Sequence, residues 1–148
     1  MTQSELPPPP TLEEVRQYAD RSGYFHLLDL RVDQAQDGSG AVSLSVDARL
    51  HHPQQVVHGG VIFTLADTAM AMAVISVLPP ETPFSTIEAK INFLRAVRTG
   101  ELRAEATILH QGRSTIVLEA TVYNKETEEQ QPIARALGTF HIGKRKQS

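Results

Sequence analysis

Apolar residues along the chain follow two patterns, one alternating and one nearly continuous. Residues 42–48 alternate between Val, Leu or Ala and a polar residue, and this period of two predicts a strand with one buried face. Residues 61–78 are apolar almost throughout, and Pro79 and Pro80 end the helix that this run predicts. Because a helix without a polar face is surrounded by protein, we expect this one at the centre of the fold.

Turn-forming residues divide the rest of the chain into further strands. Short glycine-containing or charged segments separate four apolar stretches after the helix. These stretches predict strands over residues 84–94, 101–110, 115–123 and 132–142. Before the helix, the apolar run over residues 24–33 predicts a first strand, and residues 37–40 predict a turn.

One short helix is predicted near the N-terminus. Thr11 and Glu14 have the spacing of a capping box, in which each side chain bonds the backbone amide of the other residue. We expect the helix to stop near Ser22 and Gly23, because glycine readily takes the positive φ of a helix C-cap.

A single apolar helix within a series of strands is typical of an α+β protein. The expected architecture is a curved antiparallel sheet wrapped around one long buried helix, with a short N-terminal helix. The length of 148 residues fits one domain. We expect a disordered proline-rich leader over residues 1–10, the domain over residues 11–143 and a basic tail over residues 144–148. The curved sheet leaves edges to be covered, so an oligomer is expected.

Composition and charge exclude several classes of function. The net charge of −3 lacks the basic excess of a nucleic-acid-binding protein. The chain has no cysteine, which excludes disulfides and Cys-ligated zinc and suits the cytoplasm. No signal-peptide pattern is present, and Asp67 within the apolar run argues against a membrane span. The histidines show no metal-ligand spacing and no nucleotide-binding glycine loop occurs, so we expect neither a metal nor a cofactor.

Candidate chemistry lies on the long apolar helix. A buried carboxylate such as Asp67 must be protonated, face a cleft or be hydrogen-bonded, for example to Thr64 or Thr68. Gly59 and Gly60 form either a simple tight turn or a helix N-terminus whose amides favour negative charge. Gly60 and Asp67 share a helix face but lie about 10 Å apart along the axis. Two antiparallel helices across a two-fold axis would bring the glycines of one chain to the aspartate of the other.

Three motifs resemble those of the hot-dog-fold acyl-CoA thioesterases, specifically the phenylacetate-pathway (PaaI-like) group. They are HGGVIFTLADTAMAMA from residue 58, INFLRAVRTGEL from residue 91 and HQGRST from residue 110. The resemblance covers about residues 42–143. It implies a thioester hydrolase that cleaves acyl-CoA to a free acid and CoA, with CoA as part of the substrate and no separate cofactor. It also implies a homodimer that pairs into a homotetramer.

The resemblance assigns roles to individual residues. Asp67 matches the catalytic carboxylate, acting as nucleophile or as base on water. Gly59, with Gly60 beside it, matches the amide that polarises the thioester carbonyl. Thr86 matches a hydroxyl that helps to place the attacking water. His58 matches the motif histidine, which we interpret as a residue that organises the loop.

One position departs from the family pattern and leaves alternatives open. The family often has Asn six residues before the motif histidine, where this chain has His52, whose ring can still donate a hydrogen bond. Hot-dog dehydratases and hydratases use a loop histidine and a helix carboxylate, so His52 and Asp67 leave that activity open. A non-catalytic acyl-CoA-binding module is the third alternative.

The resemblance also places the substrate. Residues expected to bind CoA are Phe93, Arg95, Arg98, His110, Gly112, Arg113, Ser114 and His141, with arginine suited to phosphate by its fork of donors. The acyl group, aromatic or of medium chain length, is expected between two protomers near Phe63, Met70 and Met72.

Overall fold

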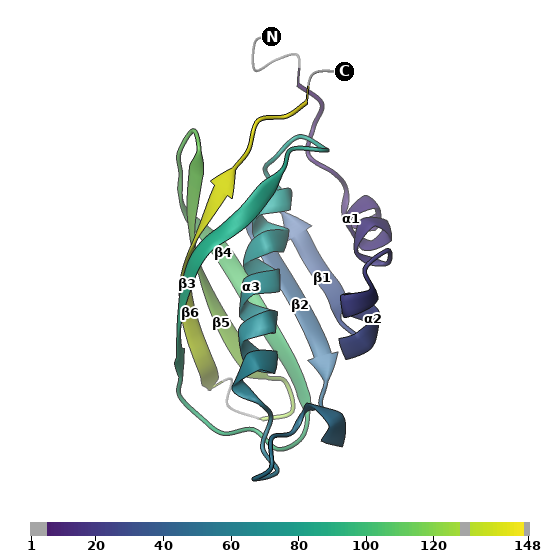
Figure 1. The fold of residues 1–148 in the computed structure, drawn as a ribbon, viewed down its shortest axis with the longest axis vertical. Helices are drawn as coiled ribbons and strands as arrows, with labels where there is room; N and C mark the ends of the chain where they lie inside the picture. Colours follow the sequence, from purple (N-terminus) through teal and green to yellow (C-terminus); the bar gives the residue numbers. More distant parts are fainter. Residues whose placement is uncertain (1–5, 128–130, 147–148) are drawn as a thin grey trace.

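The sheet of this protein curves around one long helix, as Figure 1 shows. A computed structural model describes residues 6–127 and 131–146. The sheet is antiparallel in the order β1-β2-β4-β5-β6-β3, so β1 and β3 form its two edges. The strands are β1 (Arg31–Gln36), β2 (Ser39–Ser45), β3 (Phe84–Phe93), β4 (Glu101–Gln111), β5 (Thr115–Asn124) and β6 (Pro132–Ile142). The helices are α1 (Leu12–Ala19), α2 (Gly23–Leu28) and α3 (Gly59–Ile75), with a short 3₁₀ helix at Ala48–Leu50.

These elements confirm the predicted α+β architecture. The four strands after the helix begin at the predicted residues and end within one residue of the predicted ends. Residues 1–5, 128–130 and 147–148 lie outside the described residues, so the predictions of a disordered leader and of a basic tail are not decided there. Within the described part of the chain, no helix is both long enough and apolar enough to span a membrane.

Helix α3 packs mainly against β2 and β4 and carries much of the core. Leu65 and Met70 on its sheet-facing side are fully buried. A side chain at Gly40 of β2 would overlap the Ala69 carbonyl and the Ala73 amide of α3. Glycine therefore sets how closely the helix approaches the sheet.

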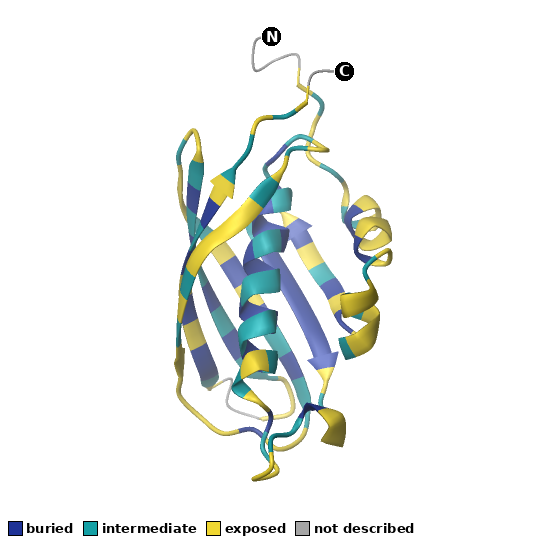
Figure 2. Cartoon of the chain, viewed as in Figure 1, coloured by how far each residue is buried: buried dark blue, intermediate teal, exposed yellow. Residues whose placement is uncertain are grey.

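One face of α3 stays partly open, which the sequence did not predict for a helix apolar on all sides. Gly60 is exposed, and Thr64, Asp67, Ala71 and Ile75 are half-buried. Their spacing of three or four residues places them on one face. Figure 2 shows half-buried, teal segments along α3. A single chain therefore leaves this face of its central helix uncovered.

The N-terminal region confirms one prediction and corrects two. The capping box is present: the Glu14 amide donates to Thr11 Oγ1 and the Thr11 amide donates to Glu14 Oε2. The helix ends earlier than predicted, at Ala19. Gly23 does not cap it but opens a second helix, α2, whose N-cap is the Ser22 side chain.

The strand predicted over residues 24–33 is therefore wrong in its first half. Residues 23–28 are helical, and the strand starts only at Arg31. Asp29, with a φ of 50°, ends α2 in the left-handed conformation. Tyr24 on α2 hydrogen-bonds Thr64 on α3 at 2.7 Å, so the apolar run folds as a small helix beside the central one.

Strand β2 is buried on both faces rather than on one, and it ends at Ser45, before Val46 and Ala48 of the predicted alternation. Ser43, predicted to face solvent, is only 1% exposed. It pairs with Arg31 of β1 and Arg103 of β4. The long side chains of these two arginines flank Ser43, which explains its burial.

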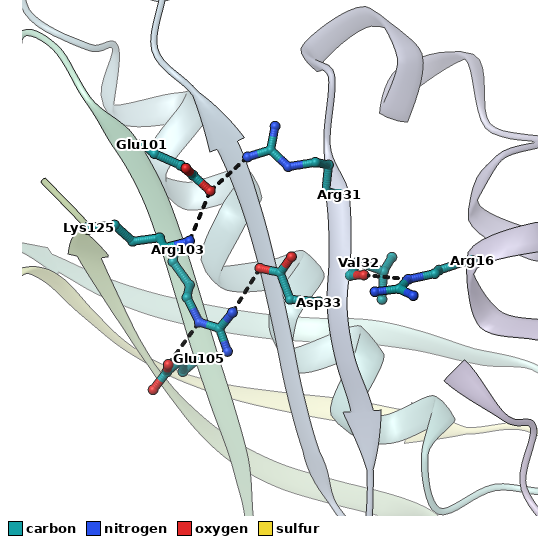
Figure 3. Close-up of polar contacts among 8 residues, drawn as sticks. All are labelled: Arg16, Arg31, Val32, Asp33, Glu101, Arg103, Glu105 and Lys125. Carbon is teal, nitrogen blue, oxygen red and sulfur yellow. Dashed lines mark hydrogen bonds and ion pairs between the residues drawn. The ribbon is translucent and has the colours of Figure 1, made fainter. Parts of the chain in front are cut away.

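Those covering side chains form an ionic cluster, drawn in Figure 3. Arg103 bonds Asp33 at 3.0 Å and Glu105 at 2.9 Å. Glu101 bonds Arg31 at 2.9 Å and Lys125 at 3.2 Å. The hydrogen bond from Lys125, with that from Arg31, holds the pKa of Glu101 below its ordinary value.

Candidate active site

Asp67 meets a hydroxyl from the edge strand of the sheet. Thr86 Oγ1 donates to Asp67 Oδ1 at 2.8 Å. A β-bulge between Thr86 and Glu88 interrupts the pairing of β3 with β6 at this point, and bulges of this kind redirect side chains next to active sites. Thr64 bonds Tyr24 instead of the carboxylate. Among the described residues, Asp67 Oδ2 has no hydrogen-bond partner, so this oxygen is open to a ligand or a water.

The N-terminus of α3 offers one free amide. His58 is the N-cap, and its Nδ1 accepts the Gly60 amide at 2.8 Å. The Val61 amide donates to the His58 carbonyl at 2.9 Å. The Gly59 amide has no partner within the described part of the chain. Of the two glycines considered from the sequence, Gly59 thus has the amide that is available to a carbonyl oxygen, while His58 organises the turn.

A pocket of about 310 Å³ opens beside this amide. His52, Gly59 and Phe93 are among its lining residues. A Cβ on Gly59 would lie 3.2 Å from Phe93 Cζ, so the missing side chain leaves room between helix and strand. The pocket therefore brings together the loop histidine, the free amide and two predicted CoA-binding residues, Phe93 and Arg95.

His52 is held in a defined orientation. Its Nδ1 accepts the Gln54 amide at 3.0 Å, so a neutral ring carries its proton on Nε2. This Nε2–H group is a hydrogen-bond donor, as the amide of the family Asn would be. His52 therefore still provides a hydrogen-bond donor at the position where the family often has Asn.

Arg98 fixes the loop that carries His52. Arg98 Nη1 donates to the carbonyls of Gln54 at 3.4 Å and Gln55 at 3.2 Å. In return, His51 Nε2 donates to the Arg98 carbonyl at 2.8 Å. The guanidinium that the resemblance assigns to CoA is therefore engaged with the backbone of the histidine loop. Only the folded loop reveals this role, because the partners lie more than forty residues away in sequence.

The remaining candidate residues form two groups at opposite ends of the strands. Phe93 ends β3 and Arg95 and Arg98 follow it, near the N-terminus of α3. Arg95 donates to the Pro132 carbonyl. At the other end, the hairpin between β4 and β5 carries His110, Gly112, Arg113 and Ser114, and His141 pairs with Thr115 beside it. The ten residues of β5 span about 33 Å between these ends. One chain does not bring the two groups together.

Of the three residues expected near the acyl group, Phe63 is half-buried, whereas Met70 and Met72 are buried and do not fit that expectation. Met70 is 0% exposed and Met72 is 4% exposed, so both belong to the closed core. Met70 packs against Gly138 of β6. Neither methionine therefore offers surface to a ligand in a single chain.

Comparison with known proteins gives a consistent result. The family model "Thioesterase superfamily" matches residues 54–130. The acyl-coenzyme A thioesterase PaaI of Escherichia coli is 33% identical over 115 residues, covering 77% of this chain and 78% of that protein. The 1,4-dihydroxy-2-naphthoyl-CoA hydrolase of Listeria monocytogenes is 28% identical, covering 76% and 91%. The solved structure of E. coli PaaI, from the phenylacetic acid degradation operon, superposes with a TM-score of 0.80 at 26% identity, covering 90% and 94%.

Proposed function

This chain belongs to the thioesterase superfamily and is a thioester hydrolase with the hot-dog fold, and on that premise we propose that it hydrolyses acyl-CoA to a free acid and CoA. The names of two relatives support CoA as the thiol part of the substrate. CoA belongs to the substrate, and the proposed reaction needs water as its only other reactant.

The hydrogen bond between Thr86 and Asp67 is the observation that carries the proposal. It fixes Oδ1 and leaves Oδ2 to accept a proton from an attacking water. The water oxygen bonds to the carbonyl carbon, the C–S bond breaks, and the CoA sulfur leaves with the proton that Oδ2 took from the water. Direct attack of Oδ2 on the carbonyl carbon, followed by hydrolysis of the anhydride, uses the same geometry.

The Gly59 amide and His52 Nε2–H are the proposed donors to the carbonyl oxygen. Both residues line one pocket, and among the described residues neither donor hydrogen has an acceptor. Donors placed in advance at the developing oxyanion are a large contribution to acyl transfer.

The complete site requires two chains. Gly59 and Asp67 lie eight residues apart on an unbroken helix, about 12 Å along its axis. A carbonyl carbon reacts with groups about 3 Å away on either side. We therefore place Gly59 of one protomer opposite Asp67 of its partner, with the two α3 helices antiparallel. The open face of α3 and the β3 edge, with exposed Ile87 and Phe93, are the surfaces available for this contact.

The same antiparallel arrangement would unite the two groups of CoA-binding candidates. Arg95 at one end of a protomer would approach Arg113 and His141 at the opposite end of its partner. Exposed Leu109 and Leu137 offer further apolar surface for the proposed pairing of dimers.

The direct test measures thiol release from a panel of acyl-CoAs. Asp67→Asn should lower kcat by about 10²–10⁴-fold, because a general base is lost. Asp37→Asn is the matched control, since Asp37 lies in the β1–β2 turn with a φ of 50°, which Asn also tolerates. Unchanged turnover in Asp67→Asn would refute the mechanism. Loss of an enoyl-CoA substrate without free thiol would instead identify a hydratase, and saturable binding without any turnover would identify a binding module.

Mixing two inactive variants tests the shared site. Gly59→Pro removes the free amide hydrogen and keeps Asp67, whereas Asp67→Asn keeps the amide. Mixed dimers contain one site with both groups intact, so a refolded one-to-one mixture should recover about a quarter of wild-type activity. A mixture as inactive as its components would exclude a site built from two chains.

A further inference from the structure

A second pocket, here called the α1–α3 pocket, lies between helix α1 and the C-terminal end of α3. Figure 1 shows where these two helices lie. Its volume is about 310 Å³. Val15, Ile75, Leu78 and Phe84 are among its apolar lining residues, and Tyr18, which also lines it, is 59% exposed. Ligand pockets begin at about this size.

Two elements connect this pocket to the carboxylate. Ile75 follows Asp67 by eight residues on the open face of α3, and the small side chain of Ala71 lies between them. On β3, Phe84 precedes Thr86 by two residues and so points to the same side of the strand. Asp67 and the pocket residue Ile75 therefore share the open face of α3, the face that borders the partner's helix in the dimer proposed above.

Three polar side chains around the pocket already have partners, whereas Glu81 and the Tyr18 hydroxyl, both on exposed residues, have none among the described residues. The Glu14 carboxylate accepts the Thr11 amide and hydroxyl. The Thr82 hydroxyl donates to the Pro79 carbonyl, and the Arg21 guanidinium lies over the Tyr18 ring at 5.0 Å. A ligand of this pocket would gain little from hydrogen bonding, which favours an apolar occupant.

We propose that the α1–α3 pocket binds the distal end of the acyl chain, and this inference rests on the proposed acyl-CoA hydrolysis. The pocket wall at Ile75 lies about 12 Å along the helix from Asp67, which is roughly ten bonds of an extended chain. The preferred substrate is then a straight medium-chain acyl-CoA such as decanoyl-CoA. A phenylacetyl group is too short to reach Ile75 from a carbonyl held at Asp67.

Chain-length profiles of two variants test the pocket. Ile75→Phe fills its inner wall and should lower the ratio of kcat/KM for decanoyl-CoA to that for butyryl-CoA by about tenfold or more, because contacts of several methylenes are lost. Tyr18→Ala shortens the rim on an exposed helix surface, so it leaves folding unaffected. It should shift the optimum from decanoyl-CoA toward dodecanoyl-CoA.

Leu27→Ala is the control, since Leu27 is an exposed apolar residue of neighbouring α2, outside the pocket. It should keep the wild-type profile. The inference is overturned if wild type prefers phenylacetyl-CoA to decanoyl-CoA, or if neither pocket variant changes the profile.

A binding measurement separates this inference from the proposed function. Titration calorimetry of Asp67→Asn with decanoyl-CoA and butyryl-CoA should show tighter binding of the longer chain, and adding Ile75→Phe should abolish the difference. If wild type releases no thiol but the variants still show this binding preference, hydrolysis is refuted and the pocket assignment stands. Equal affinity for both chains would refute the pocket.

Discussion

Replacing Gly59 by proline removes one hydrogen atom from the proposed oxyanion site with little change to the helix. Gly59 is the first residue of α3, where the backbone amide has no partner within the helix and proline is well tolerated. His58 precedes it with φ −62° and ψ 134°, an extended conformation that proline accepts in its neighbour. The substitution therefore removes the donor while the capping bond from Gly60 to His58 can persist.

The expected effect follows from that lost donor. Removal of a single oxyanion donor lowers kcat by about 10²–10³-fold, or about 2.7–4 kcal/mol. Proline also adds a Cβ, which would lie 3.2 Å from Phe93 Cζ. Gly59→Ala adds the same Cβ and keeps the amide hydrogen, so it is the matched reference.

The assay compares kcat for thiol release by the two variants on one acyl-CoA. We expect the proline variant to be about 10²–10³-fold slower than the alanine variant. Circular dichroism and thermal unfolding should show both to be folded. Equal rates for the two variants would refute the assignment of the Gly59 amide to the carbonyl oxygen and would leave His52 as the donor to examine.

Three further predictions concern loop positioning and stability. Arg98→Met should lower kcat/KM about 5–30-fold. The loss should be equal for an acyl-CoA and for the matching acyl-pantetheine, because a loosened histidine loop affects both substrates. A loss confined to the acyl-CoA would instead show that Arg98 binds a phosphate of CoA. Glu101→Gln should cost under about 1 kcal/mol in urea unfolding at neutral pH. The hydrogen bond from Lys125 lowers the pKa of Glu101 in the folded protein below the ordinary value of 4.5. The stabilisation that Glu101 contributes is therefore complete above pH 4.5, and it is lost as pH falls through the lower pKa of the folded state. Gly40→Ala should lower the free energy of unfolding by about 1–3 kcal/mol, unlike Gly23→Ala, which meets nothing within 4 Å.

The parts of the fold that the sequence predicted are those governed by local patterns. Turn residues and apolar stretches located the four later strands, and Thr11 with Glu14 located the first helix. The pattern failed at residues 24–33, because the left-handed backbone of Asp29 divides that run. It failed again at Ser43, whose burial depends on charged side chains of two neighbouring strands.

In the candidate site, too, local patterns could be predicted from the sequence, whereas contacts between distant segments could not. Asp67 and the glycines stand out in sequence because a lone carboxylate and side-chain-free amides are unusual at an apolar helix. The function of Arg98 could not be predicted, because its hydrogen bonds reach backbone carbonyls that only the closed loop brings near. The α1–α3 pocket also escaped prediction, since its walls come from segments about sixty residues apart in the chain.

The straightness of α3 links chemistry to assembly. A helix that began nearer to Asp67, or that bent between the two groups, would allow one chain to hold both sides of a thioester. In this chain Gly59–Ile75 is continuous, and its amide and carboxylate stay about 12 Å apart. The same geometry separates Arg95 from Arg113 by the length of the strands. An antiparallel second copy would bring both pairs of groups together, because each end of one chain then faces the opposite end of the other. The proposed dimer is thus a requirement of the catalytic geometry as well as a cover for exposed apolar surface.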